Sequence, residues 1–388
     1  MAASSAIPTP LASRGTAELA ELGSWAEHDG TVWCVSWSPR GDMMASCGAD
    51  KMLRVWADTS GGAADSDSGE EESFASWGCI ATLEGDQTRT VRSCRWSPDG
   101  AFIAATSFDS TTVIWEWQRD DGMAIDGGGD SDEIFQCVAI LEGHENEVKD
   151  VAWSPSGELL ATCSRDKKIW LWEAGADEEG VEFECVCILS GHSQDVKCVR
   201  WHPARPWLLS SSYDDTVKVW MEETEGNDEW LCALTLTAHS ATVWQLAFEG
   251  GLYGTHAAPS AGARPALATV SDDRSLIVWN DVTAVAGASS GSSPVLGATQ
   301  QLADLHSRSI FSVDWARDIA TGGADDAICI LQRGASGSAF ELAARKAGAH
   351  SGDVNCVSWH PSRPDILASC GDDGAVKIWR VASARTRV

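Results

Sequence analysis

The sequence is poor in positive charge. Its 28 Lys and Arg stand against 57 Asp and Glu, which gives a formal net charge of −29. Nucleic acids and anionic membrane surfaces are bound through basic faces, so this shortage argues against both as partners. No stretch of the chain approaches the roughly 18 consecutive apolar residues that a membrane-spanning helix requires. We therefore expect no nucleic-acid and no membrane partner.

Signals for secretion and for a metal centre are also missing. The segment from Met1 to Ala20 has no apolar core of signal-peptide length, which argues against secretion. The 13 Cys include no CxxC pair, the spacing typical of zinc and iron–sulfur sites. We expect no metal ligands and no other cofactor.

What the sequence does contain is a repeat. A β-branched residue is followed five positions later by an aromatic residue at Val32/Trp37, Val91/Trp96, Val148/Trp153, Val196/Trp201, Val243/Phe248, Ile310/Trp315 and Val354/Trp359. Each pair is followed by an Asp with a large apolar residue six positions later, at Asp50/Trp56, Asp109/Trp115, Asp166/Trp172, Asp214/Trp220, Asp273/Trp279, Asp325/Leu331 and Asp373/Trp379. Fixed spacing in every copy predicts one structural unit repeated along the chain.

Each unit has the features of four short strands, rich in Val, Ile, Thr and Trp and separated by turn residues. Such a sheet cannot bury both faces alone, so the units are expected to stack radially. We predict an all-β fold, a seven-bladed β-propeller over residues 17–381, with a flexible N-terminus at 1–16 and a tail at 382–388. The last repeat lacks residues for a fourth strand, so segment 17–25 is expected to pair with it and close the ring.

A polar set accompanies the repeats. A His lies four residues before the β-branched position at His28, His144, His192, His239, His306 and His350, and a Ser or Thr lies four before the Asp at Ser46, Thr162, Ser210, Thr269, Thr321 and Ser369. With the Asp and Trp, this pattern resembles the buried hydrogen-bond tetrad of WD40 repeats. A hydrolytic triad would occur once, whereas this set recurs, so we interpret it as structural and expect no catalytic residues. The second repeat, with Gly85–Gln87 and Ala105 at these positions, and the sixth, with Leu331, are expected to be less stable.

Most cysteines recur at equivalent positions of different repeats. One set is Cys34, Cys198 and Cys356, a second is Cys47, Cys163 and Cys370, and a third is Cys79, Cys137, Cys185 and Cys232. Recurrence of this kind is typical of small buried hydrophobic residues and not of a ligand set.

Long insertions are expected on one face of the propeller. They are Asp58–Ser76, Gln118–Ile134, Ala174–Glu182, Met221–Glu229 and Asp281–Thr299 after third strands, and Glu249–Pro265 after a first strand. Their Gly, Ser and acidic residues predict flexible, solvated loops, with an acidic partner-binding arm as the alternative.

The opposite face, which we call the open face, carries the candidate binding residues. The residue after each β-branched position is expected to point to the channel mouth; these are Trp33, Arg92, Lys149, Lys197, Trp244, Phe311 and Asn355. Tight turns on the same face carry Phe108, Arg165 and Tyr213. Cations beside exposed aromatics in so acidic a chain predict a partner-binding surface with Arg165 near its centre. The alternative is that these side chains only pack against one another in the channel.

Several segments resemble one particular family. They are residues 141–149 (LEGHENEVK), 160–167 (LATCSRDK), 194–197 (QDVK), 212–218 (SYDDTVK) and 350–357 (HSGDVNCV). They are similar to the WD40 subunit of the cytosolic iron–sulfur protein assembly machinery. The resemblance implies a non-catalytic adaptor that joins a MIP-type small adaptor, a HEAT-repeat scaffold and a hydrogenase-like iron–sulfur carrier. It also implies delivery of clusters to cytosolic and nuclear apoprotein clients.

Two other function classes stay open. One is a different WD40 platform, such as a ubiquitin-ligase substrate receptor or a chromatin reader, which the lack of an appended ligase or nuclear module disfavours. The other is an enzyme, which the lack of an unrepeated His, Asp, Glu or Cys constellation disfavours. We expect a cytoplasmic protein, with the nucleus open as a second location.

Overall fold

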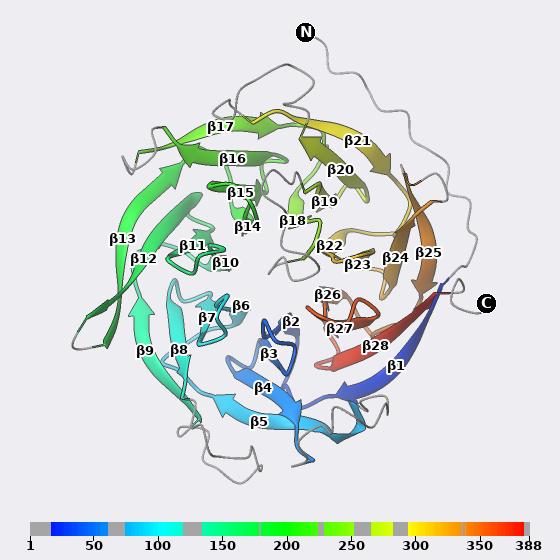
Figure 1. Ribbon diagram of the computed structural model, residues 1–388, viewed down its shortest axis with the longest axis horizontal. Coiled ribbons are helices and arrows are strands. Elements are labelled where there is room, and N and C mark those ends of the chain that lie inside the picture. Colours follow the sequence, from blue (N-terminus) through cyan, green and yellow to red (C-terminus); the bar gives the residue numbers. More distant parts are fainter. Residues whose placement is uncertain are drawn as a thin grey trace.

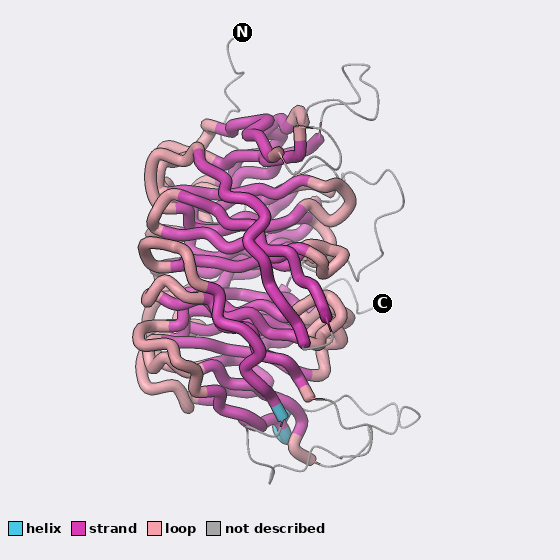
Figure 2. The backbone as a smooth tube through the Cα atoms, turned by 90° about the vertical axis from the view of Figure 1, so that its left-hand side faces the viewer, coloured by secondary structure: helices cyan, strands magenta, loops and turns pink. Residues whose placement is uncertain are grey.

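The computed structural model describes residues 17–60, 74–118, 134–177, 180–223, 229–251, 265–281, 294–334, 337 and 339–383. These residues form seven four-stranded sheets arranged in a ring around a central channel (Figure 1). Viewed from the edge, the ring is a thick disc with short turns along one face (Figure 2). The prediction of an all-β, seven-bladed propeller is confirmed.

The blades follow one another along the chain, each running from the channel to the rim. The first three are β2 (Val32–Trp37), β3 (Met43–Gly48), β4 (Leu53–Asp58) and β5 (Trp77–Leu83); β6 (Val91–Trp96), β7 (Phe102–Ser107), β8 (Thr112–Trp117) and β9 (Phe135–Leu141); and β10 (Val148–Trp153), β11 (Leu159–Ser164), β12 (Lys168–Asp177) and β13 (Gly180–Ser190). A short 3₁₀ turn, η1 (Phe74–Ser76), precedes β5.

The other four blades repeat this order. They are β14 (Val196–Trp201), β15 (Trp207–Ser212), β16 (Val217–Glu222) and β17 (Trp230–Leu236); β18 (Val243–Phe248), β19 (Leu267–Ser271), β20 (Leu276–Asp281) and β21 (Leu296–Leu302); β22 (Ile310–Trp315), β23 (Ile319–Gly323), β24 (Ile328–Arg333) and β25 (Phe340–Lys346); and β26 (Val354–Trp359), β27 (Ile366–Gly371) and β28 (Val376–Ser383), which share a sheet with β1 (Ala17–Trp25).

The ring is closed by its two ends, as predicted. Strand β1 pairs antiparallel with β28 from Ala17↔Ser383 to Trp25↔Val376. Leu19 is buried in the core of the last blades, which anchors the first strand by apolar packing as well as by its ladder. Strand β28 runs to Ser383, two residues beyond the predicted end of the propeller at 381. Residues 1–16 and 384–388 lie outside the described residues.

The tetrads have the geometry that the repeat predicts. In the first blade His28 bridges Asp50 (Nδ1–Oδ2, 2.9 Å) and Ser46 (Nε2–Oγ, 2.7 Å), and the indole N–H of Trp56 donates to Ser46 Oγ at 2.8 Å. The third, fourth, fifth and seventh blades repeat these bonds. Each set satisfies polar groups that burial would otherwise leave unpaired, so the repeated His, Ser or Thr and Asp are structural.

The two departing blades use other partners. In the second blade Gln87 Nε2 donates to the carbonyl of Ala105 at 3.1 Å, and the indole N–H of Trp115 has no partner among the described residues. In the sixth blade Leu331 supplies no indole, while Asp325 accepts a bond from Arg345 at 2.8 Å in addition to that from its His.

Two expectations need correction. The described residues of the insertion Ala174–Glu182, which are 174–177 and 180–182, continue the β12–β13 hairpin and do not form a loop. Ala174 pairs with Phe183, and Phe183 packs on Trp153 with 6.0 Å between ring centroids. Most residues of the other insertions lie outside the described part of the chain. The third cysteine set is not buried: Cys137 and Cys232 are exposed, and Cys79 and Cys185 half-buried. These cysteines pair with the tetrad Trp of their blade from the outermost strand, which has solvent on one side.

Candidate partner-binding surface

The residues predicted to surround the channel mouth are placed there by β-bulges. In every blade the pairing of the first two strands skips the residue that follows the β-branched position, for example between Val148 and Asp150. A bulged residue has no ladder partner and is turned out of the sheet. The skipped residues are Trp33, Arg92, Lys149, Lys197, Trp244, Phe311 and Asn355, and together they line the mouth, which narrows to a hollow of about 20 Å³.

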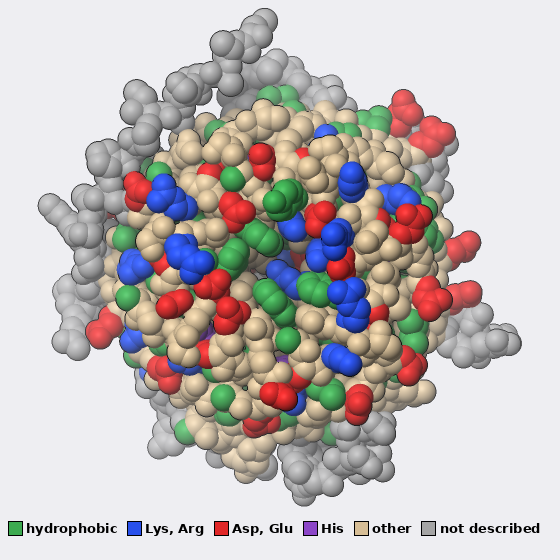
Figure 3. All heavy atoms as spheres, turned by 180° about the vertical axis from the view of Figure 1, so that it is seen from behind, with side chains coloured by type: hydrophobic (Ala, Val, Ile, Leu, Met, Phe, Trp, Pro, Cys, Tyr) green, Lys and Arg blue, Asp and Glu red, His purple; other side chains and the backbone are tan. Residues whose placement is uncertain are grey.

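Cations and aromatic rings alternate around this mouth. Arg92 lies over the ring of Trp33 at 4.9 Å, and the Lys149 ammonium lies 4.0 Å from the ring centroid of Phe108. Lys197 lies between Tyr213 and Trp244, 5.1 Å from each ring. Figure 3 shows Lys, Arg and hydrophobic side chains gathered around the central hollow, with Asp and Glu among them.

The aromatic half of the mouth is a packed pair. Trp244 and Phe311 meet edge to face, with 5.1 Å between their centroids. The indole N–H of Trp244 donates to Asp272 Oδ1 at 2.6 Å, which fixes the ring plane. Both rings remain partly exposed, so a fixed apolar surface adjoins the cations.

Arg165 stands apart from this group. It lies in the turn between β11 and β12, does not line the mouth, and pairs with Glu147 at 3.3 Å with its side chain 55% exposed. Phe108 and Tyr213 occupy equivalent turns, and Tyr213 is 51% exposed. These three form an outer rim, whereas Trp33, Arg92, Lys149, Lys197, Trp244 and Phe311 form the mouth itself.

The environment of the mouth disfavours the charged form of its lysines. Burial, together with the charges of Lys197 and Arg92, lowers the pKa of Lys149 to about 8, although Glu147 acts in the opposite direction. Burial also lowers the pKa of Lys197, against the raising effect of Asp195 at 3.3 Å. Crowded cations of this kind favour an approaching carboxylate, because it relieves their mutual repulsion.

Sequence reasoning missed the carboxylates of this face. Glu147 pairs with Arg165 and also lies 3.5 Å from Arg89, and Asp195 pairs with Lys197. Glu147 and Asp195 lie directly before the β-branched positions, and so two residues before Lys149 and Lys197. The open face is therefore a mixed surface, whose cations are partly neutralised at the rim and less so at the mouth.

No group of three or more His, Cys, Asp or Glu side chains within the described ranges is arranged to hold a metal ion. Among the same residues, no helix is long and apolar enough to cross a membrane.

Comparison with known proteins gives a consistent result. The family model described as WD domain, G-beta repeat, matches residues 20–57, 77–116, 135–173, 183–221, 230–280 and 344–380. The probable cytosolic iron-sulfur protein assembly protein 1 of Vanderwaltozyma polyspora is 45% identical over 299 residues, which cover 75% of this chain and 81% of the relative.

Two other relatives cover more of the chain. The probable cytosolic iron-sulfur protein assembly protein CIAO1 homolog of Chlamydomonas reinhardtii is 41% identical over 386 residues, 93% of this chain and 98% of the relative. The probable cytosolic iron-sulfur protein assembly protein Ciao1 of Culex quinquefasciatus is 38% identical over 364 residues, 91% and 95% of the two chains.

Proposed function

Because this chain belongs to the WD40-repeat family of cytosolic iron–sulfur protein assembly proteins, we propose that it is a non-catalytic scaffold subunit of that machinery. Its task is to hold other proteins together while iron–sulfur clusters are delivered to cytosolic and nuclear apoproteins. The names of its relatives support a cytoplasmic location. The alternative of a ubiquitin-ligase receptor or chromatin reader has no comparable support.

A scaffold role agrees with how the reactive residue types are used. The His, Asp and Ser or Thr side chains of the repeats bond to one another inside the blades. Side chains that could act as nucleophile and base are held in these internal hydrogen bonds in most blades, so they are unavailable to a substrate. The chain instead offers a broad, rigid surface on a closed ring.

The expected partners follow from the family resemblance. They are a MIP-type small adaptor, a HEAT-repeat scaffold, a hydrogenase-like iron–sulfur carrier and the apoprotein clients. We place the working surface on the open face, at Arg165, Arg92, Lys149, Lys197, Tyr213, Phe108, Trp244, Phe311 and Trp33.

The cations and aromatic rings of the mouth are the main support for a binding surface on the open face. In a chain of net charge −29, bulges present Arg92, Lys149 and Lys197 side by side with two fixed aromatic rings. Aromatic and cationic side chains that are held rigidly lose little entropy on binding, which is why they dominate interface energies. A partner segment that combines a carboxylate with a large apolar side chain would satisfy both halves.

The test is charge reversal on the open face. We expect Lys149→Glu and Arg165→Glu to fold normally and to lose the assembly partners in affinity purification from cytosol. Each change is expected to weaken binding by about 2 kcal/mol, the range of an interface hot spot. Trp244→Ala should weaken it through the aromatic half.

A matched control is Arg317→Glu. Arg317 lies between β22 and β23 on the opposite face and has a 53% exposed side chain, against 55% for Arg165. This variant should recover every partner. Loss of partners in the control alone would move the interface to the other face. Normal recovery by Lys149→Glu, Arg165→Glu and Trp244→Ala would refute the open-face placement.

A further inference from the structure

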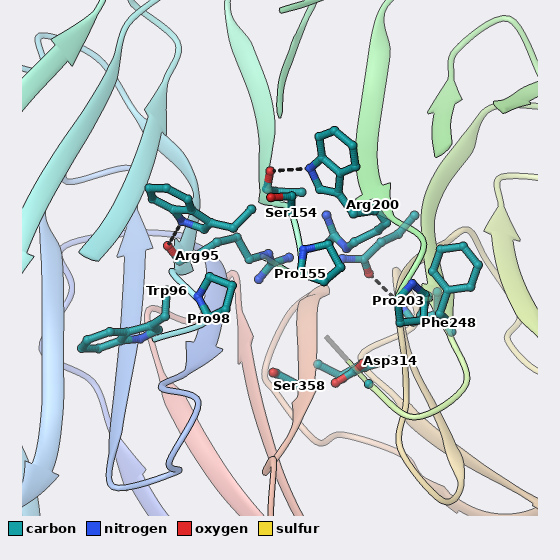
Figure 4. Close-up of a pocket in the computed structure, with 18 residues that line it drawn as sticks. Arg95, Trp96, Pro98, Ser154, Pro155, Arg200, Pro203, Phe248, Asp314 and Ser358 are labelled. Atoms are coloured by element: carbon teal, nitrogen blue, oxygen red, sulfur yellow. Dashed lines mark hydrogen bonds between the residues drawn. The ribbon is translucent and has the colours of Figure 1, made fainter. Parts of the chain in front are cut away.

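A second cavity lies at the other end of the channel, beneath the open-face mouth. It has a volume of about 240 Å³ and is lined by the ends of the first strands and the turns that follow them (Figure 4). Its walls are largely apolar, and include Trp153, Trp201, Phe248 and the prolines Pro98, Pro155 and Pro203. The engineered apolar cavity that binds benzene has about 150 Å³, so this one has room for a single-ring molecule.

Charged groups occur in this cavity at a position that other blades fill with small residues. The residue four after the β-branched position is Ser36, Ala152, Ala247 or Ser358 in four blades, but Arg95, Arg200 and Asp314 in the other three. Arg95 and Arg200 are each 5% exposed and Asp314 is 7% exposed. Burying so much charge is costly unless it is paired.

Two of these charges have partners. Arg200 forms an ion pair with the buried Asp150, which also accepts a hydrogen bond from Ser93 at 2.7 Å. Asp314 accepts the main-chain N–H groups of Trp315 at 2.8 Å and Trp359 at 2.7 Å. Those bonds satisfy one lone pair on each oxygen of Asp314.

Arg95 is different, because no carboxylate of the described residues pairs with it. Its Nη1 contacts Cys34 Sγ at 3.2 Å and the carbonyl of Cys94 at 3.4 Å. Its Nε is buried and has no partner among the described residues. Figure 4 shows the side chains of Arg95, from the second blade, and Arg200, from the fourth, reaching toward the middle of the cavity. The Asp150 carboxylate is close enough to act on Arg95, but it forms its ion pair with Arg200. Among the described residues the planar guanidinium of Arg95 therefore has no carboxylate in direct contact, the partner whose shape it matches.

We propose that this cavity binds a small organic carboxylate with a single-ring apolar body. The carboxylate pairs with Arg95, beside Arg200, and the ring fills the space between Trp153, Trp201 and Phe248. An inorganic oxyanion would pair with the guanidinium but leave the apolar part of the cavity empty. A neutral ring would fill the apolar part but leave the guanidinium without an anion. Asp314 on the far wall repels a second acidic group, so a monocarboxylate fits better than a dicarboxylate.

The first experiment titrates the full-length chain with benzoate by isothermal calorimetry, with benzamide as the neutral analogue of the same shape. We expect saturable binding of benzoate at one site per chain. Benzamide and acetate should each bind about tenfold more weakly or worse, because one lacks the charge and the other the ring. Equal affinities for benzoate and benzamide, or no heat from benzoate at millimolar concentration, would overturn the proposal.

Two variants locate the site. Arg95→Gln removes the positive charge but keeps a hydrogen-bond donor on a shorter side chain, and should remove the preference for benzoate over benzamide. Should this buried substitution prevent folding, Ala247→Leu tests the site independently, because its added methyl groups enter the cavity and leave both arginines intact. We expect Ala247→Leu to fold and to lose both ligands. Unchanged benzoate binding in Ala247→Leu would place the ligand elsewhere. Ala247 does not line the hollow at the open-face mouth, so partner recovery by Ala247→Leu is expected to be normal; Arg95 lines that hollow too, so partner recovery is read from Ala247→Leu.

Discussion

At the scale of single residues, a cation of the open face destabilises the folded state. Lys149 is held on a bulge next to Lys197 and Arg92, and its pKa is lowered to about 8. A lysine pKa below its unfolded value of about 10.4 means that folding disfavours the charged form. The penalty is present below pH 8 and disappears as the pH rises from about 8 to 10.4. Functional surfaces often retain such destabilising groups.

We therefore expect Lys149→Met to be more stable than the parent chain at pH 7. The gain should be about 1 kcal/mol after allowance for solvent screening, and it should shrink as the pH rises above 8. Thermal melts of both proteins from pH 6 to pH 10 measure it. A constant difference across this range would mean that packing on Phe108, and not charge, decides the effect.

At the scale of strands and blades, the second blade shows what one missing hydroxyl does. Ala105 stands where other blades have Ser or Thr, and the indole N–H of Trp115 is left without a partner among the described residues. In the first blade the equivalent Ser46 hydroxyl accepts the Trp56 indole at 2.8 Å. An unsatisfied buried donor costs about 1–3 kcal/mol.

Ala105→Ser should restore this bond and stabilise the chain by about 1 kcal/mol. Its control is Ala104→Ser, the same change at the neighbouring and equally buried position, which faces the other side of the strand. The control buries a hydroxyl away from the indole and should destabilise the fold. Denaturant melts of the two variants compare them directly, and equal effects in both would contradict the role given to the tetrad.

Much of the fold was predictable because each blade repeats the same spacing of residue types. The spacing of Val, Trp and Asp identified every first strand, and the position after the β-branched residue identified the seven mouth residues. The contacts between side chains were not predictable. Lys197 meets Trp244 only because their blades are neighbours in the ring, and Glu147 meets Arg165 across the β10–β11 hairpin of one blade.

Arg95 and Arg200 illustrate a signal that was present and missed. Charged residues occupy a position that four other blades fill with Ser or Ala, which marks that position as a lining of the channel. The β12–β13 hairpin was missed for another reason. Its acidic composition is typical of a loop, but Phe183 supplies enough apolar contact with Trp153 to hold it in strands.

At the scale of the whole molecule, the ring depends on non-covalent closure. Strand β1 covers the edge of β28, and without it that strand would present unpaired backbone groups to other chains. Leu19 is the buried contact of β1, at 5% exposure, while its neighbour Glu18 is exposed.

Leu19→Asp should loosen β1, lower the free energy of unfolding by about 3 kcal/mol and promote self-association through the exposed edge of β28. Light scattering with size-exclusion chromatography measures the association, and melts measure the stability. Glu18→Gln on the solvent side of the same strand should change neither. A monomeric, fully stable Leu19→Asp protein would show that β28 is protected without its partner strand.

The pairing of β1 with β28 also sets the order of events during synthesis. The first strand leaves the ribosome more than 350 residues before its partner. At about 5–20 residues per second, β1 waits roughly 20 to 70 s for the strand that completes its sheet. During that interval the nascent chain exposes one strand at its front and an unfinished edge at its back. A chain that stops early never forms a ring, so the platform exists only once the last blade has been made.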